Sequence, residues 1–198
     1  MFTFKKQKVF LLTLVISVLS WVFSEEYSTD GTFSIISLKT DTKYLPEVFA
    51  ILQEAKKELE QLWGLNVPEQ VTVVIHPTLS SFITASQMPW YVAGIANVKT
   101  NQIDLQRLKV LIERDILKRT LRHELFHLAQ SDSLSRWLAE GLAMHFAGDR
   151  LLAPPLEGIS EEMLNSLLAN PTSQGVLYRS RATAFIWSKA YLPQINSN

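Results

Sequence analysis

The sequence contains no cysteine. This absence excludes disulfide bonds, thiolate zinc ligands, a cysteine nucleophile and a lipoprotein anchor. Internal repeats and low-complexity tracts are absent as well. The chain has 198 residues, of which 47% are hydrophobic and 19% are charged, and this composition is that of a single globular domain with a sizeable core.

The chain has no excess of either charge, because 19 basic residues balance 19 acidic residues. Residues 1–24 contain three lysines and no acidic residue, so residues 25–198 hold 16 basic and 19 acidic residues, a net charge of −3. A mildly acidic domain gives no support to nucleic-acid binding.

The N-terminal segment has the pattern of a secretory signal. Three lysines precede an apolar run at residues 9–23, and the composition becomes polar abruptly at Glu25. Residues 1–24 are therefore expected to be a signal peptide cleaved before Glu25, or alternatively an uncleaved membrane anchor. The run falls short of the roughly 18–20 residues that span a bilayer comfortably. Both interpretations place residues 25–198 outside the cytoplasm, in the periplasm or the extracellular space, free or tethered to the membrane.

Strand patterns come first in the remaining sequence and helical patterns follow. Runs rich in β-branched residues predict strands over residues 32–39, 71–76, 95–98 and 102–105, the last two as a hairpin. Apolar residues spaced by three and four predict helices over residues 46–63, 108–130, 135–147, 160–168 and 181–192. This order predicts an α+β fold, with a small N-terminal sheet and a mainly helical C-terminal part.

The pattern H-E-x-x-H lies within the predicted helix of residues 108–130. The i to i+4 spacing places His123 and His127 on one face of that helix, where both can bind one metal ion. Glu124 lies about 100° around the helix from His123, so it is not expected to bind the same ion. It can, however, reach a water molecule bound there.

A third ligand is predicted on the next helix. A short turn separates the two helices, so they should run antiparallel and touch. Glu140 lies among Trp137, Leu138, Leu142 and Ala143, which should form the packed face. A carboxylate on such a face is costly unless it is paired or binds a metal. Gly141 should allow the two helices to approach closely.

The pairing of H-E-L-F-H-L with W-L-A-E-G-L-A resembles the gluzincin metallopeptidases, specifically the peptidase MA-like domains. A weaker similarity runs from about Phe33 to Leu192. The resemblance implies a zincin-like domain over residues 25–198, in which His123, His127 and Glu140 bind Zn²⁺. It also maps the catalytic base to Glu124.

The sequence differs from the patterns of related metallopeptidase groups at three points, and these differences limit which group it resembles. Met144 stands where thermolysin-like enzymes have an aspartate four residues after the glutamate ligand, so that outer partner is missing. The chain has no G-x-M-E-N segment, so exopeptidase activity is not suggested. Gln130 occupies the position of the metzincin glycine, so the metzincin pattern fails.

Two histidines and one carboxylate leave a fourth position for water, which is the arrangement of a catalytic zinc site. The expected function is hydrolysis of a peptide or protein substrate by an endopeptidase. The resemblance further implies that one strand of the residue 95–105 hairpin forms a sheet edge beside the cleft, where an extended peptide can add. It also suggests Tyr178 as the oxyanion donor, just before the last helix; the alternative is simple aromatic packing there.

Two other functions stay open. One is a zinc-binding regulatory or interaction module with little or no turnover, and the other is a zinc hydrolase of non-peptide amides. The remaining polar residues have ordinary interpretations: a surface position for His145, a structural role for His76, and a solvated helix flank for Arg119 and Arg122. The sequence does not specify an oligomeric state.

Overall fold

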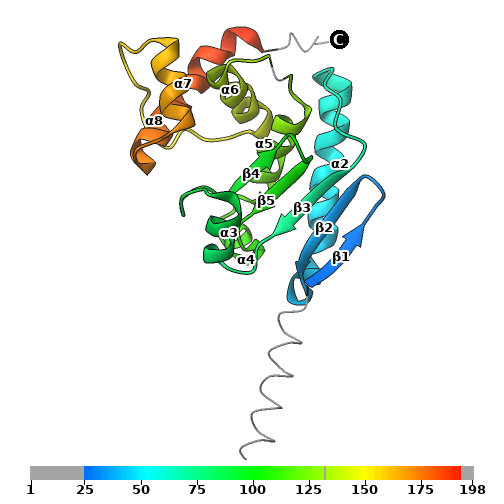
Figure 1. Cartoon of the computed structure of the whole chain (residues 1–198). Helices are drawn as coiled ribbons and strands as arrows, with labels where there is room; N and C mark the ends of the chain where they lie inside the picture. Colours follow the sequence, from blue (N-terminus) through cyan, green and yellow to red (C-terminus); the bar gives the residue numbers. More distant parts are fainter. Residues whose placement is uncertain (1–24, 132, 193–198) are drawn as a thin grey trace, which may run out of the picture.

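The computed structural model describes residues 25–131 and 133–192, and the predicted signal or anchor at residues 1–24 lies outside this range. The chain has an α+β fold, as predicted, with the sheet on the N-terminal side and a mostly helical remainder. Figure 1 shows the C-terminal helices gathered beyond one end of the sheet, away from the first strand. Within the described range, no helix is long and apolar enough to span a bilayer.

The sheet has five strands in the order β1-β2-β3-β5-β4. The strands are β1 (Glu25–Thr29), β2 (Phe33–Leu38), β3 (Val71–Ile75), β4 (Gly94–Asn97) and β5 (Gln102–Leu105). The central strands β2, β3 and β5 run parallel, while β1 and β4 pair antiparallel at the two edges. The predicted hairpin of β4 and β5 is confirmed, and β4 is the edge strand.

Two helices lie between strands in the chain, and the others follow the last strand. The helices are α2 (Leu45–Leu62), α3 (Leu79–Ser86), α4 (Leu108–Glu113), α5 (Leu117–Ala129), α6 (Arg136–Ala147), α7 (Glu161–Ala169) and α8 (Gln174–Ser188), with 3₁₀ turns η1 (Lys39–Tyr44) and η2 (Lys189–Tyr191). The main core packs α2 and α5 against alternate residues of β2, β3 and β5. A second, smaller cluster joins α6, α7 and α8. Helix α5 therefore lies between the sheet and the C-terminal helices (Figure 1).

Two elements were not predicted. Strand β1 contains no buried residue, so it shows no apolar signal, and it forms a hairpin with β2 around Gly31 at φ 100°. Helix α3 begins with a capping box, in which Thr78 and Ser81 each accept a hydrogen bond from the other's backbone N–H. The motif is readable in the sequence, but only Phe82 of this helix is buried. The short apolar signal is therefore weak.

The prediction of one helix over residues 108–130 is wrong. The chain forms α4 and α5, separated at Asp115, which adopts φ 52°. The backbone N–H of Asp115 donates to the carbonyl of Ile112, and that of Ile116 donates to Leu111. Aspartate tolerates this left-handed conformation better than most residues. No glycine or proline marks the break, which is why the apolar spacing alone missed it.

The last helix begins earlier than predicted. Helix α8 starts after Ser173, whose side chain accepts a hydrogen bond from the backbone of Val176, and it ends at Ser188 rather than Leu192. Ser180, Thr183 and Ser188 are buried in it. These polar residues face the protein interior, so the helix lacks a clear apolar stripe.

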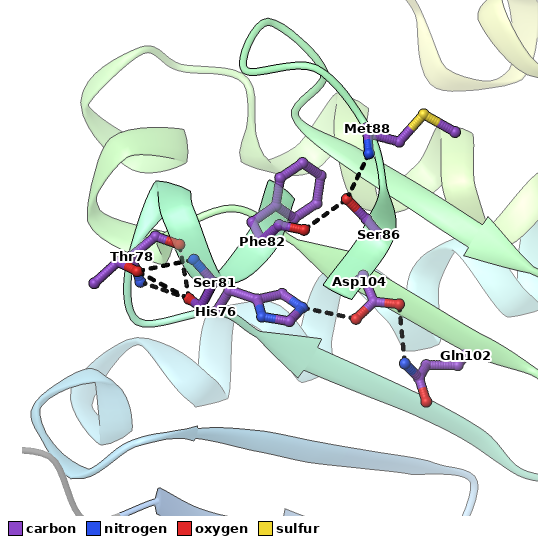
Figure 2. Close-up of polar contacts among 8 residues, drawn as sticks. All are labelled: His76, Thr78, Ser81, Phe82, Ser86, Met88, Gln102 and Asp104. Carbon is purple, nitrogen blue, oxygen red and sulfur yellow. Dashed lines mark hydrogen bonds and ion pairs between the residues drawn. The ribbon is translucent and has the colours of Figure 1, made fainter. Parts of the chain in front are cut away.

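A buried polar pair joins β3 to β5, as expected of a structural His76. Figure 2 shows the Nε2 of His76 beside Asp104 Oδ1, at 2.7 Å, while the other carboxylate oxygen of Asp104 accepts a hydrogen bond from Gln102. The His76 ring also meets the edge of Phe82 from α3. The interpretation of His76 as structural is thus consistent with its surroundings.

Candidate metal centre

Helix α5 carries the H-E-x-x-H pattern in its second half. His123 and His127 lie one turn apart, and their Nε2 atoms are 3.1 Å from each other. His123 is 3% exposed and Glu124 is 6% exposed, so both are held in the interior of the protein. The predicted shared face of the two histidines is confirmed.

Helix α6 packs against α5 and brings Glu140 to the same place. The predicted neighbours Trp137, Leu142 and Ala143 are buried, and Leu138 is half-buried. The Glu140 side chain is only 16% exposed, so its predicted position on a packed face is also confirmed. Its Oε2 lies 3.6 Å from Nε2 of His123, and its Oε1 lies 3.6 Å from Nε2 of His127.

These three side chains fit a zinc ion. One donor atom from each of them lies within 4.8 Å of the others. Tetrahedral zinc with bonds of about 2.0–2.1 Å separates its ligand atoms by about 3.3 Å. The two imidazole nitrogens are 3.1 Å apart, and each lies 3.6 Å from one of the two Glu140 oxygens, which is close to that value. Two imidazoles and one carboxylate are also the donors of catalytic zinc sites.

Asp149 orients the first histidine. Its Oδ2 lies 3.0 Å from Nδ1 of His123, which leaves Nε2 directed at Glu140. Metal-binding histidines commonly donate their second N–H to such a carboxylate. Met144 leaves the thermolysin-type position without an aspartate, as expected, but the site still has an outer carboxylate. Asp149, which follows the left-handed Gly148 at the end of α6, supplies that carboxylate.

Arg181 from α8 forms an ion pair with the third ligand. Its Nε lies 3.1 Å from Oε2 of Glu140, and the two side chains are 30% and 16% exposed. Burial alone would raise the pKa of Glu140, but Arg181 and the two histidines outweigh it and hold that pKa well below its ordinary value. Glu140 is therefore ionised and available as a ligand. The sequence analysis assigned no role to Arg181.

The two histidines differ in their protonation. Burial opposes the charged form of His123, yet its hydrogen bonds with Asp149 and Glu140 raise its pKa to about 9. Burial lowers the pKa of His127 to about 4. At neutral pH without a metal, His127 is therefore neutral, whereas His123 carries a proton that a metal ion must displace.

Glu124 faces the edge strand. Burial raises its pKa above the ordinary value, and the charges of His123 and Arg181 oppose this shift only in part. Gly94 at the start of β4 permits the close approach, because a Cβ there would lie 2.9 Å from Thr120 Cγ2 and 3.2 Å from Glu124 Cγ. Strand β4 is thus held tightly against the Glu124 side of α5.

Two cavities meet at this point. One, of about 680 Å³, is lined by Glu124, His127 and Glu140 together with strand β4. The other, of about 360 Å³, is lined by His123, Glu124 and Asp149. Glu124 and Arg181 line both, so the candidate site is open on two sides.

Tyr178 lies one turn before Arg181 and lines the smaller cavity. It stands inside α8, not before the last helix as expected. Its hydroxyl accepts a hydrogen bond from Gln174 Nε2 at 2.7 Å. The residue lines a cavity that Glu124 also lines, and its role as an oxyanion donor stays a prediction.

Three smaller expectations are corrected by the structure. Arg122 is not solvated, because it donates to the carbonyl of Phe146, pairs with Glu58 at 2.8 Å and is 8% exposed. His145 is half-buried and its ring stacks on Phe185. Gly141 allows close approach of α8 to α6, since an added Cβ would overlap α8 and not α5.

A scan against known protein-family models gives no match, and no curated protein matches the sequence significantly. The functional assignment of this chain therefore depends on its own residues and their geometry.

Proposed function

We propose that this protein is a zinc-dependent peptidase of the gluzincin type, with a peptidase MA-like, zincin-like domain at residues 25–198. The observation that supports the proposal best is the meeting of His123, His127 and Glu140 within 4.8 Å, beside a buried Glu124. The N-terminal pattern supports export, with the domain released or anchored outside the cytoplasm.

His123, His127 and Glu140 would hold the metal ion. Zinc bound there would supply a Lewis acid and an activated water. Asp149 fixes the ring of His123 through Nδ1, and Arg181 keeps Glu140 ionised. These two residues position the ligands and need not touch the substrate.

Glu124 is the proposed catalytic base. Glu124 is not placed to bind the metal ion together with the three ligands, because its side chain lies against β4 and lines both cavities. Its raised pKa brings its carboxylate closer to the range in which a group both accepts and returns a proton at neutral pH. Glu124 would accept a proton from water and then deliver it to the leaving amine.

Strand β4 supports an extended substrate. It is an edge strand, and Gly94, Ile95 and Ala96 line the larger cavity beside Glu124. A peptide in extended conformation could pair with this edge and place one of its carbonyl groups near the ligand cluster. This geometry favours a peptide over a compact small amide as substrate.

A zinc module without turnover is the alternative from outside the enzyme class. The apparent absence of an outer carboxylate favoured it, but Asp149 provides that group. The intact, buried Glu124 further supports catalysis.

A peptide-library digest with zinc-loaded protein tests the proposal. Wild type should cleave peptides, and Glu124→Gln should retain zinc and lose roughly 10²–10⁴-fold in rate. Cleavage of non-peptide amides alone would assign the hydrolase alternative. Full zinc occupancy without any cleavage that depends on Glu124 would contradict the peptidase proposal.

Tyr178→Phe examines the oxyanion donor separately, because it keeps the aromatic ring and removes only the hydroxyl. If the hydroxyl acts as the donor, kcat should fall by about 10²–10³ with little change in KM. An unchanged kcat would assign Tyr178 to packing.

A further inference from the structure

Four arginines line the smaller cavity, two from helices and two from segments that follow helices. Arg114 directly follows α4, Arg119 lies in the first turn of α5, Arg150 follows α6, and Arg181 belongs to α8. Residues this far apart in the sequence converge only because the helices fold together beside Glu124. We refer to this space of about 360 Å³ as the arginine cavity.

The positive charge of the arginine cavity is only partly balanced. The acidic residues that line it are Glu124 and Asp149, and Asp149 already bonds to His123. Arg181 is paired with Glu140, whereas Arg119 donates only to the backbone carbonyl of Asp115. A guanidinium that bonds to a neutral carbonyl keeps its full charge.

Two of the guanidinium groups have no partner. Among residues 25–131 and 133–192, the side chains of Arg114 and Arg150 make no ion pair and no hydrogen bond. Each offers five donors in a planar fork that matches a carboxylate. Both side chains are exposed, so their guanidinium groups are accessible to an anionic group of a ligand in the cavity that Glu124 also lines.

The larger cavity has a different character. Its arginines are Arg136 and the shared Arg181, and the carboxylates of Glu124 and Glu140 balance them. The two cavities adjoin, because Glu124 and Arg181 line both of them. A peptide that occupies both cavities would therefore meet balanced charge in the larger one and an excess of positive charge in the arginine cavity.

We infer that the arginine cavity binds a carboxylate of the substrate, on one side only of the cleaved bond. The inference rests on the proposed peptidase function, and it names the substrate class as acidic peptides. The carboxylate would come from an aspartate or glutamate side chain, or from the C-terminus of a short peptide. Arg114 and Arg150 would be the residues that select it.

Binding is measured first, without turnover. Fluorescein-labelled, C-terminally amidated peptides carry glutamate or glutamine at each position in turn, and they are titrated into the zinc-loaded Glu124→Gln protein. Glutamate should strengthen binding at positions on one side only, roughly three- to tenfold. A matched peptide with a free C-terminus and no acidic side chain separates the two sources of the carboxylate.

Arginine variants then locate the selectivity. Arg114→Gln combined with Arg150→Gln should abolish the preference for glutamate while leaving the affinity for the glutamine peptide within about twofold. Arg136→Gln, the matched control in the larger cavity, should preserve the preference. Higher salt should weaken binding of the glutamate peptide alone, because exposed charges are screened.

The outcomes separate this inference from the proposed function. Equal binding of glutamate and glutamine peptides by a protein that cleaves peptides would overturn the inference alone. An intact preference in the double arginine variant would overturn it as well. Selective binding of the acidic peptide, with no cleavage by wild type, would overturn the peptidase proposal and support the arginine cavity as a binding site.

Discussion

Gly141 on α6 offers the sharpest quantitative prediction, because the same substitution elsewhere should have the opposite effect. A methyl group at Gly141 would overlap the carbonyl oxygen of Ala184 and the hydroxyl of Ser188, and would lie 2.6 Å from Ser188 Cβ. Overpacking a tight contact costs about 1–3 kcal/mol. The upper end applies, since a helix carbonyl cannot rotate away. Alanine regains about 1 kcal/mol over glycine in helix propensity. Gly141→Ala should therefore lose about 2 kcal/mol of unfolding free energy.

Gly175 in the first turn of α8 is the matched control. A Cβ there would meet nothing closer than Ser173 Oγ at 3.9 Å, so Gly175→Ala should gain up to about 1 kcal/mol. Urea unfolding, followed by circular dichroism, measures both variants. For a domain of this size, Gly141→Ala should also lower Tm by about 4–8 °C. Equal stability of the two variants would refute the close contact between α6 and α8, and with it the placement of Arg181 against Glu140.

Three further predictions concern the ligands and the buried charges. The pKa of His123 is raised to about 9, and this residue must lose its proton to bind a metal, so zinc affinity should rise about tenfold from pH 7 to pH 8. Competition with a chelating dye measures the affinity at each pH. An affinity that does not change with pH would contradict the assigned protonation of His123. Asp149→Asn should weaken zinc binding by about 10–100-fold in the same assay, and unchanged affinity would deny it an orienting role. Arg122→Met should lower the free energy of unfolding, measured in urea, by about 2–4 kcal/mol, because it leaves the Phe146 carbonyl and the Glu58 carboxylate without a partner. Arg119→Met on the same helix should lower it by less than about 1 kcal/mol. Equal losses in the two variants would contradict the burial of Arg122.

The three candidate metal ligands could be predicted from the sequence because their placement depends on local geometry. His123 and His127 share a face by helix periodicity alone. Glu140 follows within one short connection, on a helix whose apolar face is evident. The edge position of β4 needed the resemblance as well, since a hairpin does not reveal which of its strands is outermost.

The supporting residues could not be predicted, because tertiary packing brings them to the site. Arg181 reaches Glu140 only through the contact of α6 with α8, and the buried serines and threonine of α8 conceal its apolar face. The contact of Asp149 with His123 could not be predicted, because it depends on α6 ending at Gly148 and on the direction that the chain takes after it. Arg122 looked like a surface residue because Glu58, its partner, lies on α2, far away in the sequence.

Zinc stoichiometry of the purified, folded protein tests the central claim most directly. The geometry predicts one zinc ion per chain in wild type and in Glu124→Gln, and loss of that ion in His127→Ala and in Glu140→Ala, with circular dichroism confirming that each variant is folded. A folded wild-type protein that binds no zinc when zinc is supplied, or ligand variants that bind it as well as wild type, would contradict the assignment of His123, His127 and Glu140 as a metal centre.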